Sequence, residues 1–236
     1  MTVTARLALT DTGEAADLSA FLLRLLRFDK AAAVRLQAVD PAAADGGLSA
    51  DGVLAVFGRL PLGESGVLAI RTARLDGLDE PVDLTVSAGQ LLDGVDADSG
   101  AVALPAPVTG PAWAGLLPPR VGWRPVGTPP AAEVCRELMA AVREFRERSE
   151  AVPAHHRTRA VLDRLADEVW SRPVAVLPEL PLRAVHASYR IGFLSPEAPL
   201  SVHRAGGWLR LSSPVGSVVV RTAAAPGAGL GLSPLR

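Results

Sequence analysis

Residues 105–130 contain eight prolines and two tryptophans, and this segment limits how the chain can fold. Proline has no amide hydrogen and a fixed φ angle, so a proline-rich segment interrupts helices and strands. Trp113 and Trp123 are costly to leave in water, so we expect the segment to be ordered and draped over a domain. The segment therefore predicts a linker between a first part at residues 1–104 and a second part at residues 131–222.

The first part contains several short runs with the composition and alternation typical of strands. These runs are Val3–Leu9, Ala33–Val39, Gly52–Leu60, Val67–Leu75 and Val82–Ser87. From Glu14 to Phe28, apolar residues recur at helical spacing after a capping-box start at Asp11. Because the connections between successive strands are short, we expect antiparallel pairing. The first part therefore predicts a mostly antiparallel sheet with one packed helix.

The second part predicts three helices followed by a β-hairpin. The helices are expected to begin at Thr128–Pro129, at about Ala154 and at Pro181. The strands that follow are Leu200–Arg204, Gly207–Ser212 and Gly216–Thr222, with Gly206–Gly207 as the hairpin turn. Residues 223–236 are rich in glycine, alanine and proline and predict a flexible tail. The whole chain thus predicts the α+β class.

Composition favours a cytosolic bacterial protein. The chain has one lysine against 23 arginines and no asparagine, which indicates a GC-rich genome. Arginine richness is therefore weak evidence for phosphate binding. The single cysteine, Cys135, excludes an internal disulfide and suits a reducing compartment. No run reaches the roughly 18 apolar residues of a membrane span, so we expect no membrane partner.

The two parts differ in charge. Residues 1–130 carry 10 basic and 15 acidic side chains, whereas residues 131–222 carry 13 and 10. Opposite signs are compatible with docking of the two parts on each other, or with a complementary contact in a dimer.

No motif for catalysis, a metal or a cofactor is present. His155 and His156 are adjacent, so on a helix they point about 100° apart and predict a solvated helix start rather than a metal site. Cys135 falls on an apolar stripe and predicts a small buried side chain. We therefore expect no catalytic residues, metal or cofactor. An enzyme whose site assembles from dispersed residues such as Arg120, His186 and Cys135 stays an alternative.

The outline of three helices and a hairpin also allows a winged-helix-like DNA-binding regulator. In that alternative the third helix presents Arg183, His186 and Arg190, and the hairpin contributes Arg204 and Arg210. The modest positive charge of the second part and the low aromatic content make nucleic acid a less favoured partner.

Tryptophan is a frequent hot-spot residue in protein interfaces. Trp113 and Trp123, with Arg120 between them, are therefore the candidates for an interaction site in the linker. The favoured hypothesis is a non-enzymatic binding or regulatory protein that acts through protein–protein contacts, including self-association. Within this hypothesis Arg120 is expected to pair with Trp123 and fix the linker.

Three stretches carry a resemblance to a family. They are Leu117-Pro118-Pro119-Arg120-Val121-Gly122-Trp123-Arg124-Pro125-Val126-Gly127, Val169-Trp170-Ser171-Arg172-Pro173 and Gly207-Trp208-Leu209-Arg210-Leu211-Ser212. Together they resemble uncharacterised proteins of high-GC actinobacteria over residues 115–222. The resemblance implies a bacterial cytosolic protein and no particular activity.

Overall fold

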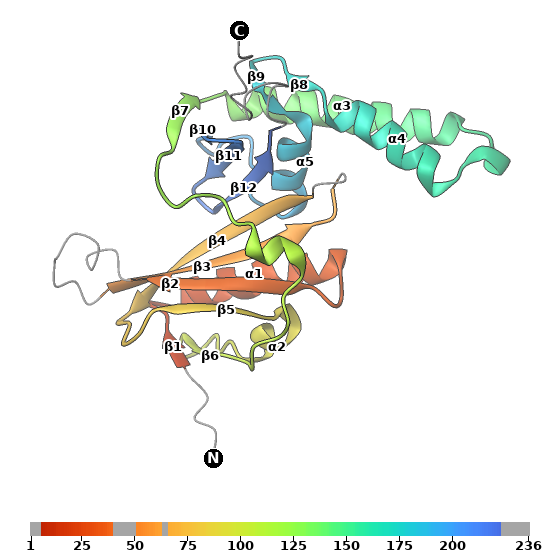
Figure 1. Cartoon of the computed structure of the whole chain (residues 1–236). Helices are drawn as coiled ribbons and strands as arrows, with labels where there is room; N and C mark the ends of the chain where they lie inside the picture. The colour runs from red at the N-terminus through yellow and green to blue at the C-terminus, as the bar shows by residue number, and fades with distance from the viewer. Residues whose placement is uncertain (1–5, 40–50, 63–65, 223–236) are drawn as a thin grey trace, which may run out of the picture.

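The computed structural model describes residues 6–39, 51–62 and 66–222, and the predicted tail at 223–236 lies outside this part. The α+β class is confirmed. In the described part of the chain, five α-helices accompany one large antiparallel sheet of eight strands (Figure 1). None of the described helices is long and apolar enough to cross a membrane.

The large sheet contains strands from both parts of the chain. In spatial order they are β5 (Val82–Ser87), β2 (Ala33–Val39), β3 (Asp51–Leu60), β4 (Val67–Asp76), β12 (Gly216–Arg221), β11 (Trp208–Ser213), β10 (Ser201–Ala205) and β7 (Arg124–Gly127). Two small two-stranded antiparallel sheets lie outside it: β1 (Arg6–Ala8) with β6 (Ala101–Ala103), and β8 (Pro173–Val174) with β9 (Leu177–Pro181).

The helices are α1 (Thr12–Phe28), α2 (Ala88–Asp93), α3 (Ala131–Ala151), α4 (Arg159–Trp170) and α5 (Leu182–Arg190), with short 3-10 turns η2 (Ala112–Gly115) and η3 (Ala154–His156). The predicted start of α1 is confirmed, because the Asp11 carboxylate accepts a hydrogen bond from the amide of Glu14 at 2.9 Å. Figure 1 shows α3 and α4 extending beyond the sheet as a two-helix arm.

Two predicted helix starts are wrong. The first helix of the second part does not begin at a Thr128 cap. Pro130 precedes its first turn and makes no side-chain cap. The second does not begin at Ala154, because Thr158 caps α4 by accepting from the amide of Val161 after the separate turn η3. The predicted hairpin turn is confirmed: Gly206 has a φ of +52°, which favours glycine.

The pairing of β4 with β12 joins the two parts into one sheet. Residues 68–70 of β4 pair antiparallel with residues 217–219 of β12. At this joint Val67, Leu68, Ala69 and Ile70 are all buried, so β4 is covered on both faces. A continuous apolar run is typical of a strand that is covered in this way. The joint therefore lies inside the protein.

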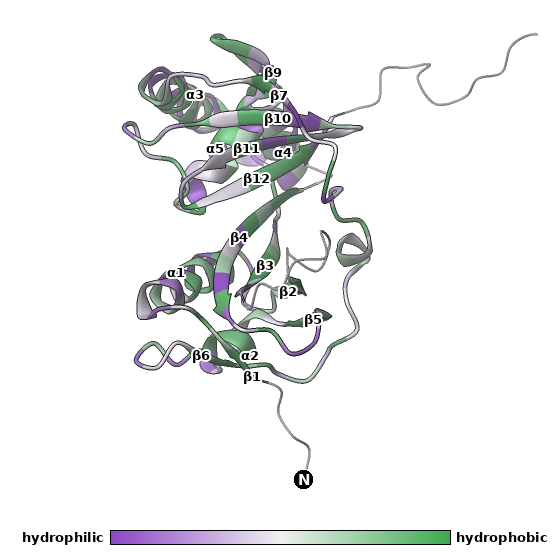
Figure 2. Ribbon diagram, turned by 90° about the vertical axis from the view of Figure 1, so that its left-hand side faces the viewer, coloured by the Kyte–Doolittle hydropathy of each residue, from purple (hydrophilic) through white to green (hydrophobic). Residues whose placement is uncertain are grey.

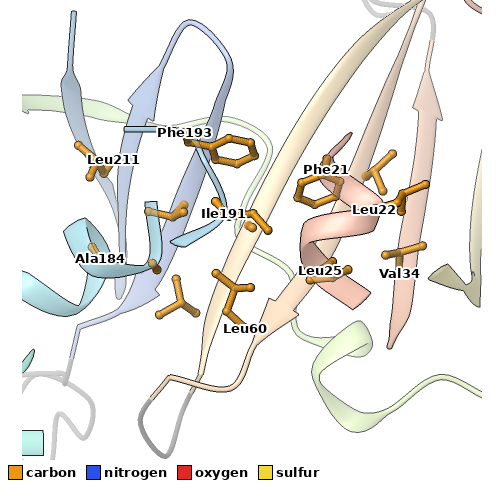
Figure 3. Close-up of a cluster of buried hydrophobic side chains, with 14 of the residues drawn as sticks. Phe21, Leu22, Leu25, Val34, Leu60, Ala184, Ile191, Phe193 and Leu211 are labelled. Atoms are coloured by element: carbon orange, nitrogen blue, oxygen red, sulfur yellow. The ribbon is translucent and has the colours of Figure 1, made fainter. Parts of the chain in front are cut away.

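Helices from both parts cover one face of the joint (Figure 3). The ring of Phe21, on α1, stacks on that of Phe193, which follows α5, at a centroid distance of 5.8 Å. A Cβ added at Gly216, at the start of β12, would lie 2.5 Å from the Phe193 ring, so this close packing requires glycine. Ile191 and Leu25 are fully buried in the same cluster. The hydrophobic core is therefore shared by the two parts.

The proline-rich linker crosses the opposite face of the sheet, on the side away from α1 and α5 (Figure 2). A second, smaller hydrophobic cluster lies beneath it. This cluster consists of Phe57, Leu68, Ile70 and Val219, with Ala55, Trp113, Leu117, Trp123 and Trp208 packed against them. Since these residues come from β3, β4, β11, β12 and the linker, the linker covers the joint from the second side.

An arginine links the first part to the second next to the joint. The Arg71 side chain, on β4, is 11% exposed and faces α1. Its Nη2 lies 2.6 Å from a carboxylate oxygen of Asp17, and its Nη1 donates to the carbonyl of Val215 between β11 and β12. The Asp17 side chain is 57% exposed, so this ion pair contributes only about 0.2–1 kcal/mol. Arg71 therefore connects α1 with the β11–β12 turn.

A chain with one shared core should unfold in one transition. We expect calorimetric and van't Hoff enthalpies to agree for the intact chain. F193A should lower the free energy of unfolding by about 3–5 kcal/mol and move the entire transition, because it removes a buried ring shared by both parts.

The matched control is L23A, since Leu23 lies on α1 but is half exposed. It should change the free energy of unfolding by less than about 0.5 kcal/mol. Two separate transitions, of which F193A moves only one, would show that the parts fold independently.

Candidate interaction surface

The four strands at one end of the sheet carry only positive charge. We call β7, β10, β11 and β12 the basic end. They contain the four arginines Arg124, Arg204, Arg210 and Arg221, and no acidic residue. The sequence around them is also free of acids over residues 99–132 and 198–222. None of the four arginines forms an ion pair within the described residues. The basic end therefore carries arginine charge that no close ion pair within the described residues neutralises.

Two of these arginines lie over tryptophan rings on the linker side of the sheet. The register aligns Trp208 with Arg221, and the Arg221 guanidinium carbon lies 5.0 Å from the Trp208 ring centroid. The guanidinium carbon of Arg210 lies 4.3 Å from the centroid of Trp123 in the linker. Contacts of this kind hold an arginine in place without neutralising its charge.

Trp123 anchors the end of the linker to the sheet. Its indole Nε1 donates to the carbonyl of Pro119 at 2.8 Å, which closes a turn. The predicted pairing of Trp123 with Arg120 is wrong, because Arg210 from β11 occupies the ring face. Arg120 is exposed instead. The pKa of Asp83 on β5 is lowered, against desolvation, mainly by hydrogen bonds from Arg35 and Gln37, and the charge of Arg120 adds the smallest contribution. Trp113 is half buried in the cluster beneath the linker.

Arg210 is the most desolvated arginine of the basic end. Burial lowers the pKa of its guanidinium group. Its Nε and the Nδ1 of His203, the residue opposite it on β10, are buried and have no hydrogen-bond partner among the described residues. A buried polar group without a hydrogen bond is costly, so these two nitrogens need a water molecule or another polar partner.

Arg124 and Arg204 form the outer edge of the basic end. They lie directly opposite each other across the β7–β10 pair, and both are exposed. The neighbouring Pro125 has no amide hydrogen to offer an added strand. The edge is therefore suited to side-chain contacts rather than to extension of the sheet.

The linker beside the basic end also exposes apolar side chains. Val121 is 80% exposed and Leu116 is 53% exposed, although both are large hydrophobic residues. They lie within a few residues of Trp123 and Arg124. Positive charge next to exposed apolar groups is a combination that protein interfaces use.

The opposite end of the sheet is acidic. Residues 75–119 contain no basic residue and seven acidic ones. We call these seven residues the acidic end: Asp76, Asp79, Glu80, Asp83, Asp93, Asp96 and Asp98. Asp83 lies on β5 and Arg124 on β7, which are the two edge strands of the large sheet, so these two charges lie at opposite edges (Figure 1).

The structure does not bring the five nucleic-acid candidates to one face. Arg183 donates to Asp167 on α4 at 3.1 Å, and the His186 ring stacks on Trp170 at a centroid distance of 4.1 Å. Arg190 lies over the ring of Phe28. These contacts turn the polar residues of α5 toward neighbouring elements. Arg204 and Arg210 belong to the basic end instead.

The three residues of the dispersed enzyme site are also apart. His186 lines a cavity between α3, α4 and α5 whose lining includes neither Arg120 nor Cys135. Cys135 is partly buried, and desolvation, with a smaller effect of Glu197, raises the pKa of its thiol. A thiol with a raised pKa is a poor nucleophile at neutral pH. Within the described residues, no three His, Cys, Asp or Glu side chains gather as a metal site.

Sequence reasoning missed the basic end as a unit because it summed charge over two halves of the chain. A finer signal was available. The segments without acidic residues and the segment without basic residues can be read directly from the sequence. Only the strand order shows that residues 124–127 and 201–221 lie together and far from β5.

Comparison with known families divides the chain at the linker. Residues 2–115 match a Domain of unknown function (DUF8010). Residues 118–225 match a second Domain of unknown function (DUF8185). The chain thus combines matches to two uncharacterised domain families. No curated protein and no solved structure gives a significant match.

The buried histidine predicts a pH effect on stability. Burial, with a smaller effect of Arg190, lowers the pKa of His186 to about 4. An unfolded histidine has a pKa of about 6.5, so between these values the unfolded chain binds a proton that the folded chain does not. Stability should therefore fall as the pH decreases from about 6.5 to about 4, by about 3 kcal/mol from this group.

Chemical unfolding at several pH values tests this effect. H186F keeps an aromatic ring against Trp170 and cannot titrate, so its stability should depend less on pH in this window. H155Q removes an exposed histidine and should behave like the unaltered chain. Equal pH dependence of H186F and the unaltered chain would show that His186 is not the group responsible.

Proposed function

We propose that this chain is a non-enzymatic, cytosolic binding protein that uses its basic end to engage an acidic protein surface. The observation that carries the proposal is the set of four arginines on adjacent strands with no acidic residue among them. Complementary charge speeds association and selects the partner.

Two features favour a protein partner over nucleic acid. The ring faces of Trp123 and Trp208 are occupied by Arg210 and Arg221, so they are poorly placed to stack on bases. The exposed Val121 and Leu116 suit apolar side chains of a partner and have no role in phosphate contact. An acidic surface that also carries apolar residues fits both features.

The lack of a side-chain nucleophile in the cavity beside His186 favours binding over catalysis. The cavity beside His186 is lined by no Cys, Ser, Thr or Tyr. His186 has a pKa of about 4, so it is neutral at physiological pH and is a weak base.

A second copy of this chain is a specific candidate for the partner. The acidic end carries seven carboxylates without a basic residue in the same segment. Asp83, on the edge strand β5, is paired with Arg35 at 2.7 Å, and the other six form no ion pair among the described residues. Two copies arranged antiparallel would place each basic end on the other's acidic end, as a two-fold dimer requires.

Charge reversal tests the proposed function. In R124E/R204E the edge of the basic end becomes acidic, so attraction for an acidic partner turns into repulsion. We expect affinity for a labelled peptide rich in Glu and Leu to fall by about tenfold or more, since each exposed pair contributes about 0.2–1 kcal/mol and both signs change. Fluorescence anisotropy measures this affinity.

The control R136E/R143E makes the same change in net charge at two exposed arginines of α3 and should bind the peptide normally. Sedimentation equilibrium at low and high salt shows whether the partner is a second copy. Tighter binding of single-stranded DNA than of the peptide, or equal peptide binding by both double variants, would contradict the proposal.

A further inference from the structure

A cavity of about 480 Å³ lies where the two parts of the chain meet. Pro61 and Leu62, at the end of β3, form the wall contributed by the first part. The second part contributes side chains from three helices: Phe145, Arg159, Asp163, Ala166, Asp167, Trp170, Arg183 and His186. Small-molecule sites commonly have this volume and often lie between domains.

The inner wall of the cavity is mainly apolar and is built around stacked rings. Trp170 is 8% exposed and packs between two rings. The His186 ring stacks on the Trp170 ring with an interplanar angle of 15°. The centroids of the Phe145 and Trp170 rings lie 5.7 Å apart. Leu62 and Ala166 complete the apolar lining. A flat apolar body would find a fixed surface here, which lowers the entropy cost of binding.

The polar groups at this wall are the Arg183–Asp167 ion pair and the His186 ring. The Arg183 side chain is 24% exposed and makes one hydrogen bond among the described residues, from Nη2 to Asp167 at 3.1 Å. A guanidinium has five N–H donors, so its other donors stay available. The neutral His186 ring has one N–H and makes no hydrogen bond with the described residues. A carboxylate, which accepts several hydrogen bonds, would satisfy both groups.

The other charged pair lies at the mouth of the cavity. Arg159 and Asp163 are 94% and 66% exposed and lie 3.5 Å apart. A pair this exposed is well hydrated and contributes little to selection of a ligand. The choice between ligands therefore rests on Arg183 with its partner Asp167, on His186 and on the apolar wall.

We propose that this cavity binds a small organic monocarboxylate with a flat apolar body. Its carboxylate accepts hydrogen bonds from Arg183 and the His186 ring, and its body packs against Leu62, Phe145 and Ala166. Because Leu62 belongs to the first part and the helices to the second, the ligand contacts both parts at their seam. It stabilises the folded chain according to its concentration and affinity.

Titration of the intact chain with phenylacetate and indole-3-acetate tests the proposal, with phenylacetamide as the uncharged probe. NMR signals of the His186 ring report occupancy at the site itself. We expect saturable shifts of these signals with the acids and at least about tenfold weaker binding of the amide. Signals of the exposed His155 ring should not move.

R183Q should weaken binding of the acids by about tenfold or more, because it removes a charged donor to the carboxylate. The matched control is R164Q, since Arg164 is an exposed arginine on α4 outside the cavity, and it should bind normally. Any of three results would overturn the proposal. The His186 signals could stay unchanged at millimolar concentrations of the acids, the acids and the amide could bind equally well, or R183Q and R164Q could bind the acids with equal affinity.

Discussion

The rest of the structure depends on three residue pairs, where β4 meets β12. This short antiparallel pairing makes one sheet out of strands that are more than a hundred residues apart in sequence. On one face it is covered by the stacked rings of Phe21 and Phe193, and on the other by the linker tryptophans. A bare pairing of this length would be weak. Burial on both faces protects its hydrogen bonds from water, so the two parts form one folded body.

The joint also sets where the charged surfaces and the cavity lie. It holds Asp83 of the acidic end and Arg124 of the basic end at opposite edges of one sheet, so neither charge can fold back to neutralise the other. It brings the end of β3 against α4 and α5, which closes the cavity beside His186. The proposed protein contact and the proposed ligand site therefore use different surfaces of a single rigid frame. A ligand at the seam would act on the contact between the parts.

Local structure was largely predictable from the sequence, whereas the assembly was not. Alternation gave β2 and β5 with correct bounds, and the Asp11 cap located α1, because these features depend on neighbouring residues. The joint left only a weak signal, the continuous apolar runs 67–70 and 218–220, which periodicity alone does not assign to a partner. The strand order decides that Arg210, and not Arg120, lies over the Trp123 ring. The strand order also brings the arginines of the basic end together. Pocket residues such as Leu62 have no sequence signal at all.

Hydrogen exchange at the joint tests the central claim most directly. In the intact chain, the amide protons shared between residues 68–70 and 217–219 should exchange only through global unfolding, with protection equal to that of the interior of β3. Faster exchange at these positions, while β3 and β11 stay protected, would mean that the sheet is divided at the joint and that the two parts are separate bodies.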